Sequence, residues 1–136
     1  MNIGKKVIFY MAALSLLASC TSDIGDRLDG KWQLQQVETE GKVEKLDTIY
    51  YNFQTSLFMY QIYNPATDAF SHCYGFKVME TKKQVMLELT NYSVSLNKFL
   101  PQTDWETPTR RFIVEELTDK RLVMKGDDRR YTFRRF

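Results

Sequence analysis

Apolar and polar side chains alternate with a period of two along most of the chain after residue 30, as in β-strands that bury one face. The longest run covers residues 70–78, where Phe70, Tyr74 and Phe76 share one side with His72. Shorter runs predict strands over residues 31–38, 49–53, 57–63, 85–89, 111–117, 121–125 and 130–136. Residues 91–108 are less regular and are expected to form a long loop with a strand near 94–99. No helical stripe exceeds about two turns, so the pattern predicts an all-β domain.

Turn-forming residues separate these runs, as at Glu40-Gly41 and at residues 64–68, 81–83, 118–119 and 126–128. Short strands at this spacing are typical of an antiparallel sandwich or barrel, and a closed barrel leaves no edge strand. We therefore predict an antiparallel up-and-down barrel of about eight strands over residues 30–136. The many aromatic residues favour a largely filled interior.

The first nineteen residues have the pattern of a secretory signal peptide. Lys5 and Lys6 precede an apolar run over residues 7–17, and this run is shorter than the ~20 residues that a membrane span needs. We expect residues 1–19 to be the signal peptide and residues 20–29 to form a short tether with one turn.

The segment Leu17-Ala18-Ser19-Cys20 resembles the lipobox of bacterial lipoproteins. The resemblance implies that Cys20 becomes the first residue of the mature chain, with a diacylglycerol on its sulfur and an acyl chain on its amine. Two or more chains of this kind anchor a protein stably. Thr21 stands where an aspartate would favour inner-membrane retention in enteric bacteria. We therefore predict a cell-envelope lipoprotein of the outer membrane and leave open which side the domain faces.

Charge and the scarcity of reactive side chains narrow the function classes. Two of the nineteen Lys and Arg residues precede Cys20, which leaves seventeen against seventeen Asp and Glu, and this balance argues against a nucleic-acid partner. One histidine and two cysteines exclude a Cys/His zinc cluster. Cys73 and His72 are neighbours on a strand and should point to opposite faces. Without a recognisable catalytic motif, we predict no enzyme activity, cofactor or metal.

Gly30-Lys31-Trp32, at the start of the first strand, resembles the Gly-x-Trp opening of lipocalins and the wider calycin group. The resemblance implies that Trp32 closes the bottom of the barrel and that an arginine of the last strand packs over its indole. The period of the last strand does not separate its candidates, and we select Arg134 from Arg130, Arg134 and Arg135.

The end of the chain, over residues 112–135, looks like that of the small lipocalin-like lipoproteins of Bacteroidota, whose domain has no known function. The resemblance extends over residues 28–136. It implies a module that binds a small ligand inside or at the mouth of the barrel. The predicted anchor at Cys20 makes the membrane a further partner.

Three functional hypotheses remain open at this point. In the first, aromatic side chains and the single histidine line a site for a small apolar or aromatic ligand, although they can equally be core. The predicted ligand-binding residues are Tyr51, Phe53, Phe70, His72, Tyr74 and Phe76. In the second, a filled barrel presents its outer surface to an envelope protein partner. The third, a hydrolase, requires His72 beside an acid and a hydroxyl in a cleft.

Overall fold

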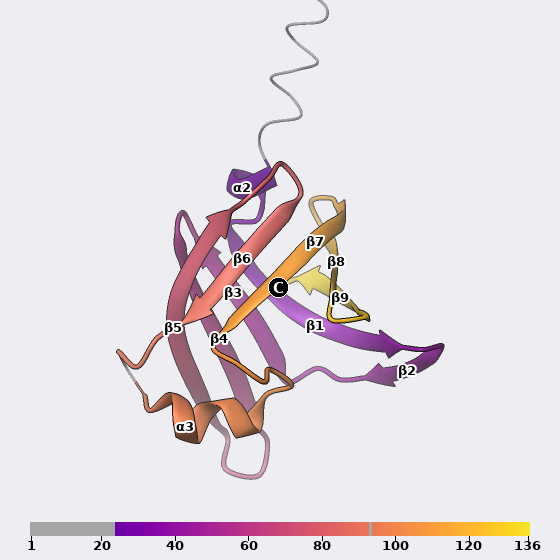
Figure 1. Cartoon of the computed structure of the whole chain (residues 1–136). Coiled ribbons are helices and arrows are strands. Elements are labelled where there is room, and N and C mark those ends of the chain that lie inside the picture. The colour runs from indigo at the N-terminus through magenta and orange to yellow at the C-terminus, as the bar shows by residue number, and fades with distance from the viewer. Residues whose placement is uncertain (1–23, 93) are drawn as a thin grey trace, which may run out of the picture.

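The computed structural model of the chain describes residues 24–92 and 94–136, and these residues form a nine-stranded antiparallel sheet that closes on itself (Figure 1). The predicted signal peptide and the residues around Cys20 lie outside the described residues. The strands are β1 (Gly30–Thr39), β2 (Lys42–Lys45), β3 (Ile49–Gln54), β4 (Leu57–Asn64), β5 (Ala69–Met79), β6 (Gln84–Leu89), β7 (Thr109–Leu117), β8 (Arg121–Gly126) and β9 (Arg129–Arg135). The short helices are α2 (Ile24–Arg27), α3 (Leu96–Phe99) and the 3₁₀ turn η1 (Leu100–Gln102).

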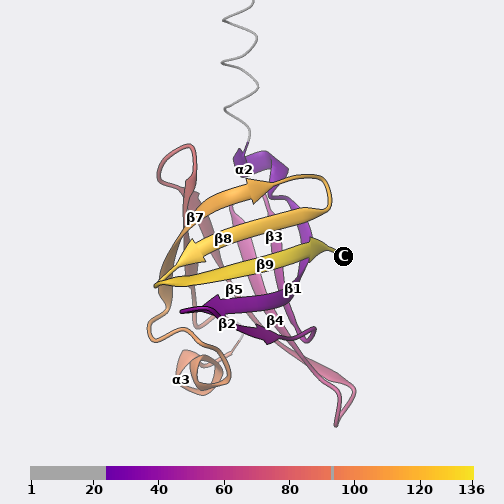
Figure 2. The same cartoon turned by 90° about the vertical axis from the view of Figure 1, so that its right-hand side faces the viewer.

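Closure of the barrel depends on the pairing of the first strand with the last. From β3 to β9 each strand pairs with the next, and β9 then pairs with β1 over Trp32–Thr39. Figure 2 shows β7, β8, β9 and β1 side by side across this seam. Eight strands, all except β2, make the wall, which confirms the predicted up-and-down barrel.

The other edge of β1 is divided between two strands. Residues 30–33 pair with β3, whereas residues 36–39 pair with the short strand β2. The hairpin of β1 and β2 therefore extends beyond the barrel wall (Figure 1). The sequence pattern did not predict β2, because all four of its residues are exposed and no apolar alternation marks it.

The interior is filled with aromatic side chains. Tyr51 lies at its centre, with ring centroids of Phe58, Tyr60 and Phe133 at 5.1, 5.0 and 4.9 Å. Trp105 enters from the loop between β6 and β7, and its ring lies 6.0 Å from that of Phe58. Edge-to-face and offset pairs of this kind add to the stabilisation that comes from burial. The expectation of a largely filled core is thus confirmed.

One predicted strand is wrong. Residues near 94–99 form α3 and not a strand, and η1 continues from it with Pro101 in its first turn. Proline has no amide hydrogen to donate and is tolerated there because that hydrogen would have no partner within the helix. The helix directs Phe99 into the core, where its ring lies 5.5 Å from Tyr60.

Trp32 closes the end of the barrel next to α2. Its Nε1 donates to the Leu28 carbonyl at 2.8 Å, and the guanidinium carbon of Arg135 lies 4.2 Å from the centre of the indole. The selection of Arg134 is therefore wrong. In the register of β1 and β9, Trp32 is opposite Arg135 and Gln33 is opposite Arg134, and directly opposed residues lie on the same face of the sheet.

Arg135 also fixes the segment that leads into β1. Its Nη1 and Nη2 donate to the backbone carbonyls of Asp29 and Arg27, and its Nε donates to the backbone carbonyl of Asp119. Gly30 has φ +130°, and a Cβ there would overlap Nη1 of Arg135. Only glycine combines this backbone conformation with so close an approach.

Candidate functional site

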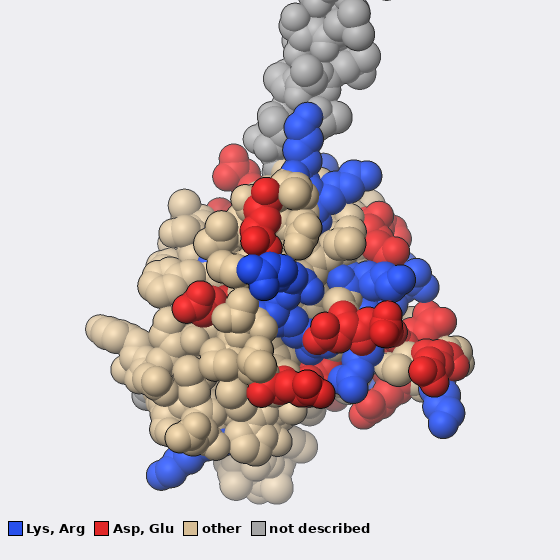
Figure 3. All heavy atoms as spheres, viewed as in Figure 1, with Lys and Arg blue, Asp and Glu red and all other residues tan. Residues whose placement is uncertain are grey.

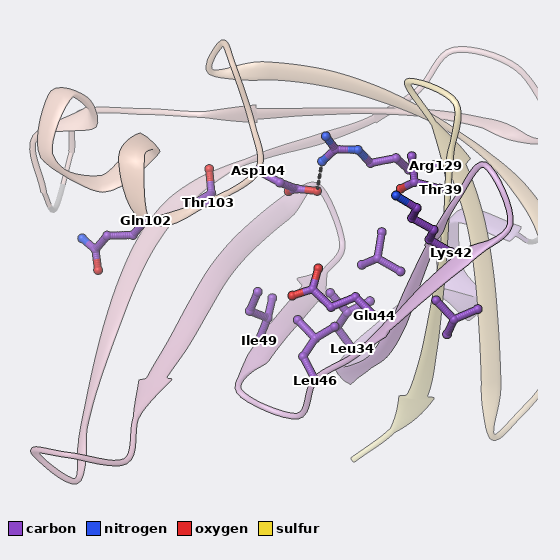
Figure 4. Close-up of a pocket in the computed structure, with 12 residues that line it drawn as sticks. Leu34, Thr39, Lys42, Glu44, Leu46, Ile49, Gln102, Thr103, Asp104 and Arg129 are labelled. Atoms are coloured by element: carbon purple, nitrogen blue, oxygen red, sulfur yellow. Dashed lines mark hydrogen bonds and ion pairs between the residues drawn. The ribbon is translucent and has the colours of Figure 1, made fainter.

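A cavity of about 460 Å³ opens at the end of β1 that is remote from Trp32 (Figure 4). Three segments enclose it: the hairpin of β1 and β2 with the chain that leads from it into β3, the end of η1 with the two residues after it, and the start of β9. Its lining residues are Leu34, Val37, Thr39, Lys42, Val43, Glu44, Leu46, Ile49, Gln102, Thr103, Asp104 and Arg129. The cavity lies at the mouth of the barrel and not in its interior, which aromatic side chains occupy.

One side of this mouth cavity is aliphatic. Leu34 is buried, and Val37, Leu46 and Ile49 are half-buried against the core. A β-bulge explains why both Leu34 and Val37 point inward although they are three residues apart. The pairing of β1 with β9 shifts between Leu34 and Gln36, so that one extra residue separates the two inward positions.

The opposite side of the mouth cavity is polar and is organised by Asp104. Its carboxylate accepts hydrogen bonds from Arg129 at 3.0 Å, from Arg110 at 3.2 Å and from the Tyr131 hydroxyl. These three donors hold the Asp104 carboxylate in place and balance its charge. Arg129 has 39% of its side chain exposed, so the outer part of its guanidinium faces the opening.

Burial and Asp104 together determine the ionisation of Tyr131. Removal from water raises the pKa of Tyr131 first, and the hydrogen bond to the Asp104 carboxylate raises this pKa further. The hydroxyl therefore remains a donor at neutral pH. Arg110, with 5% of its surface exposed, donates to the same hydroxyl and keeps its charge beside Asp104.

The rest of the polar network lies deeper and has a structural role. The Trp105 Nε1 donates to the Tyr51 hydroxyl at 3.0 Å, and both side chains are buried. Burial raises the pKa values of Tyr51 and Tyr60 well above their usual range. These hydroxyls are thus neutral hydrogen-bonding groups in the core, and neither tyrosine is among the residues that line the mouth cavity.

The predicted ligand-binding residues divide between the two faces of the sheet. Tyr51 and Phe53 point inward and are buried core residues. Four others lie on the outer face of β5 and therefore do not line the barrel interior, an orientation that the alternating pattern leaves open: Phe70, His72, Tyr74 and Phe76.

The reason lies in the neighbouring strands. Phe58 and Tyr60 of β4 already fill the interior beside β5, so only smaller or flexible residues of β5 fit there. Gly75 and Cys73 face inward, and Lys77 extends its amine to the Gly25 carbonyl at 2.6 Å.

Cys73 and His72 point to opposite faces, as predicted. The Cys73 thiol is buried, lies 3.3 Å from the Thr90 carbonyl and has a pKa raised by burial. His72 is on the exposed side, with its ring 5.5 Å from that of Tyr74. Residues 24–92 and 94–136 contain no cluster of three or more metal-binding side chains and no helix long and apolar enough to cross a bilayer.

The sequence pattern does not predict that the residues of the mouth cavity form a site. The inward position of Val37 depends on a bulge that the alternating pattern does not reveal. Asp104 lies in the irregular loop, twenty-five residues from its partner Arg129. The only signal was the aliphatic character of Leu34, Leu46 and Ile49, which is equally typical of core.

Comparisons with known proteins agree on the fold. A family model described as a lipocalin-like domain matches residues 15–136. A crystal structure of a lipocalin-like protein from Bacteroides uniformis is similar at a TM-score of 0.72 and 26% identity, over 81% of this chain and 99% of that one. An uncharacterized protein from Bacteroides eggerthii is similar at a TM-score of 0.67 and 29% identity, over 80% of this chain and 99% of that one. No curated protein matches the chain.

Proposed function

Because the chain belongs to the lipocalin-like domain family, we propose that it is a non-catalytic envelope lipoprotein that binds a small, mainly apolar ligand at the mouth of its barrel. The observation that carries this proposal is the mouth cavity of about 460 Å³ with its aliphatic side. Small-molecule sites commonly have volumes of ~300–1,000 Å³ and combine apolar walls with a few polar groups.

The two sides of the mouth cavity suit different parts of one ligand. An apolar body would contact Leu34, Val37 and Ile49, and it would displace water from the half-buried Val37 and Ile49. A polar or anionic group would meet the exposed part of Arg129, which Asp104 holds in position at 3.0 Å. Because the interior is filled, we expect the ligand to lie in the mouth and not to extend toward Trp32.

Native mass spectrometry of the protein purified from its own host would identify such a ligand. The binding site is then tested with Leu46→Trp, whose larger side chain would fill part of the mouth cavity. Leu46 lies in a loop, so the substitution leaves the strand register unchanged. Ile113→Trp is the matched control because it enlarges an exposed aliphatic residue on the outer face of β7.

We expect Leu46→Trp to abolish binding of the recovered ligand and Ile113→Trp to bind it like the wild type. Equal binding by all three proteins would mean that the ligand lies elsewhere. Repeated recovery of an empty protein would count against a carrier.

Anchoring at the outer membrane through an acylated Cys20 is the second part of this proposal, and the lipobox-like sequence supports it. The alternative role, a module that binds an envelope protein, draws on a different feature. The outer face of β3, β4 and β5 is unusually poor in charge.

A further inference from the structure

Three neighbouring strands of the wall present an outer face without any Asp, Glu, Lys or Arg, and the structure describes all of their residues. We refer to it as the uncharged outer face. It consists of Asn52, Gln54, Leu57, Met59, Gln61, Tyr63, Phe70, His72, Tyr74, Phe76 and Val78. Tyr50, at its border with β1, is buried beneath Phe136 and the Lys31 amine. The outer faces of β7 and β9, in contrast, carry Arg111, Glu115, Arg130 and Arg134. Figure 3 shows one face of the molecule, on which most Lys, Arg, Asp and Glu side chains gather over β7 and the hairpin of β1 and β2, whereas the side of β5 and α3 carries few of them.

The apolar part of this face is continuous and exposed. Leu57 is directly opposite Phe76 and Met59 is opposite Tyr74 in the pairing of β4 with β5. Leu57, Phe76 and Tyr74 are 52%, 50% and 43% exposed. With Tyr92 they line a shallow hollow of about 500 Å³. Contiguous exposed apolar surface of this kind marks an interaction site with a protein or a membrane.

This apolar region lies at the end of the barrel where the described chain begins. Lys77, next to Phe76, donates to the Gly25 carbonyl at 2.6 Å. The side chain of Met79, at the end of β5, lies against Gly25 of α2. The turn before Leu57 is held to the same region, because the Thr55 amide donates to Asp29 at 2.9 Å.

The predicted lipid attachment site is only four residues before Ile24. Four residues span at most ~14 Å even when fully extended, so an acylated Cys20 keeps α2 close to the bilayer. Phe76 is three residues from Met79, a distance of about 10 Å along a strand. The anchor therefore holds the apolar region within reach of the membrane at a high effective concentration.

We infer that the uncharged outer face rests on the bilayer that holds the anchor, with Leu57, Phe76 and Val78 in the interfacial region. Tyr74 is suited to this level because its ring is apolar and its hydroxyl remains hydrated. Lys82 and Lys83, in the turn that follows β5, lie at the same end and match anionic headgroups. The inference depends on the acylation of Cys20 that is part of the proposed function.

The test uses the protein that a lipoprotein-processing bacterium makes from the full-length sequence, reconstituted in vesicles of phosphatidylethanolamine and phosphatidylglycerol, with and without nitroxide-labelled lipid. Phe76→Trp places a fluorescent probe on the uncharged outer face. Ile113→Trp places the same probe on β7 at a residue that is 52% exposed, against 50% for Phe76. Trp32 and Trp105 are buried in both proteins and give a common background.

We expect the nitroxide lipid to cause a loss of fluorescence and the vesicles to cause a blue shift for the probe at position 76, with neither effect at position 113. Equal quenching at the two positions would overturn the inference. A blue shift at position 76 without quenching would also overturn it, because a protein and not lipid would then cover this face.

Flotation of the vesicles separates this failure from failure of the anchor. Protein that floats with the vesicles but shows an unquenched probe at position 76 leaves the anchor intact and refutes the docking. Protein that stays in the aqueous fraction refutes the acylation of Cys20 and the docking with it. Neither result bears on the ligand that is proposed for the mouth cavity.

Discussion

Replacement of Arg135 by alanine is expected to destabilise the barrel far more than the same replacement of its neighbour Arg134. Arg135 donates to three backbone carbonyls and lies 4.2 Å from the centre of the Trp32 indole, whereas Arg134 donates to the side chain of Gln33. The two residues are adjacent and have the same charge, so the comparison isolates the contacts of Arg135.

The magnitude follows from these contacts. Hydrogen bonds to a charged donor contribute ~1.5–3 kcal/mol when buried, and we reduce this to about 0.5–1 kcal/mol each because the guanidinium is partly in water. The stacking on Trp32 adds about 1 kcal/mol. We therefore expect Arg135→Ala to cost about 2.5–4 kcal/mol, or roughly 10–20 °C in Tm. Arg134→Ala should cost about 0.5 kcal/mol for its one side-chain hydrogen bond.

Urea unfolding followed by tryptophan fluorescence measures both variants, with the free energy taken from midpoints at an unchanged m value. Arg135→Lys adds a further comparison. Lysine keeps the charge but cannot bond three carbonyls with the geometry of a guanidinium, so it should recover only part of the loss. If Arg134→Ala is as costly as Arg135→Ala, the closure that we derive for this end of the barrel is wrong.

Three further predictions concern other parts of the molecule. Cys20→Ala should release the protein from the membrane fraction, and unchanged fractionation would contradict the proposed anchor. Tyr51→Phe should cost ~1–3 kcal/mol in urea unfolding because it leaves the buried Trp105 Nε1 without an acceptor. Stability should fall above about pH 10, since burial raises the pKa values of Tyr51, Tyr60 and Tyr131. The unfolded chain then releases these protons first and binds fewer than the folded chain, so rising pH favours unfolding. Urea midpoints across this range check the effect, and Tyr131→Phe should flatten the decline.

The strands of the wall could be predicted from sequence because most of them bury one face and leave the other in water. The face of β5 could not. One face carries Phe70, Tyr74 and Phe76 and the other the smaller set around Gly75, and the alternation alone does not show which face points inward. The structure places the aromatic set outside because Phe58 and its neighbours fill the interior, a constraint that no single strand reveals.

The prediction that Arg134 packs over Trp32 is wrong for a related reason, since the residue that does so is Arg135. Arg135 shares its face with Tyr131 and Phe133, and both of these point into the barrel. That alternation is visible in the sequence. It becomes decisive only when the register of β9 against β1 is known, because this register places Arg135 opposite Trp32.

The seam between β1 and β9 has a consequence for the order in which the chain is made. One edge of the first strand remains unpaired until the last strand has been synthesised, almost a hundred residues later. A ribosome-bound chain that lacks β9 therefore cannot complete the barrel, and contacts so distant in sequence form slowly. Closure of the wall is thus a late event in folding that waits for β9.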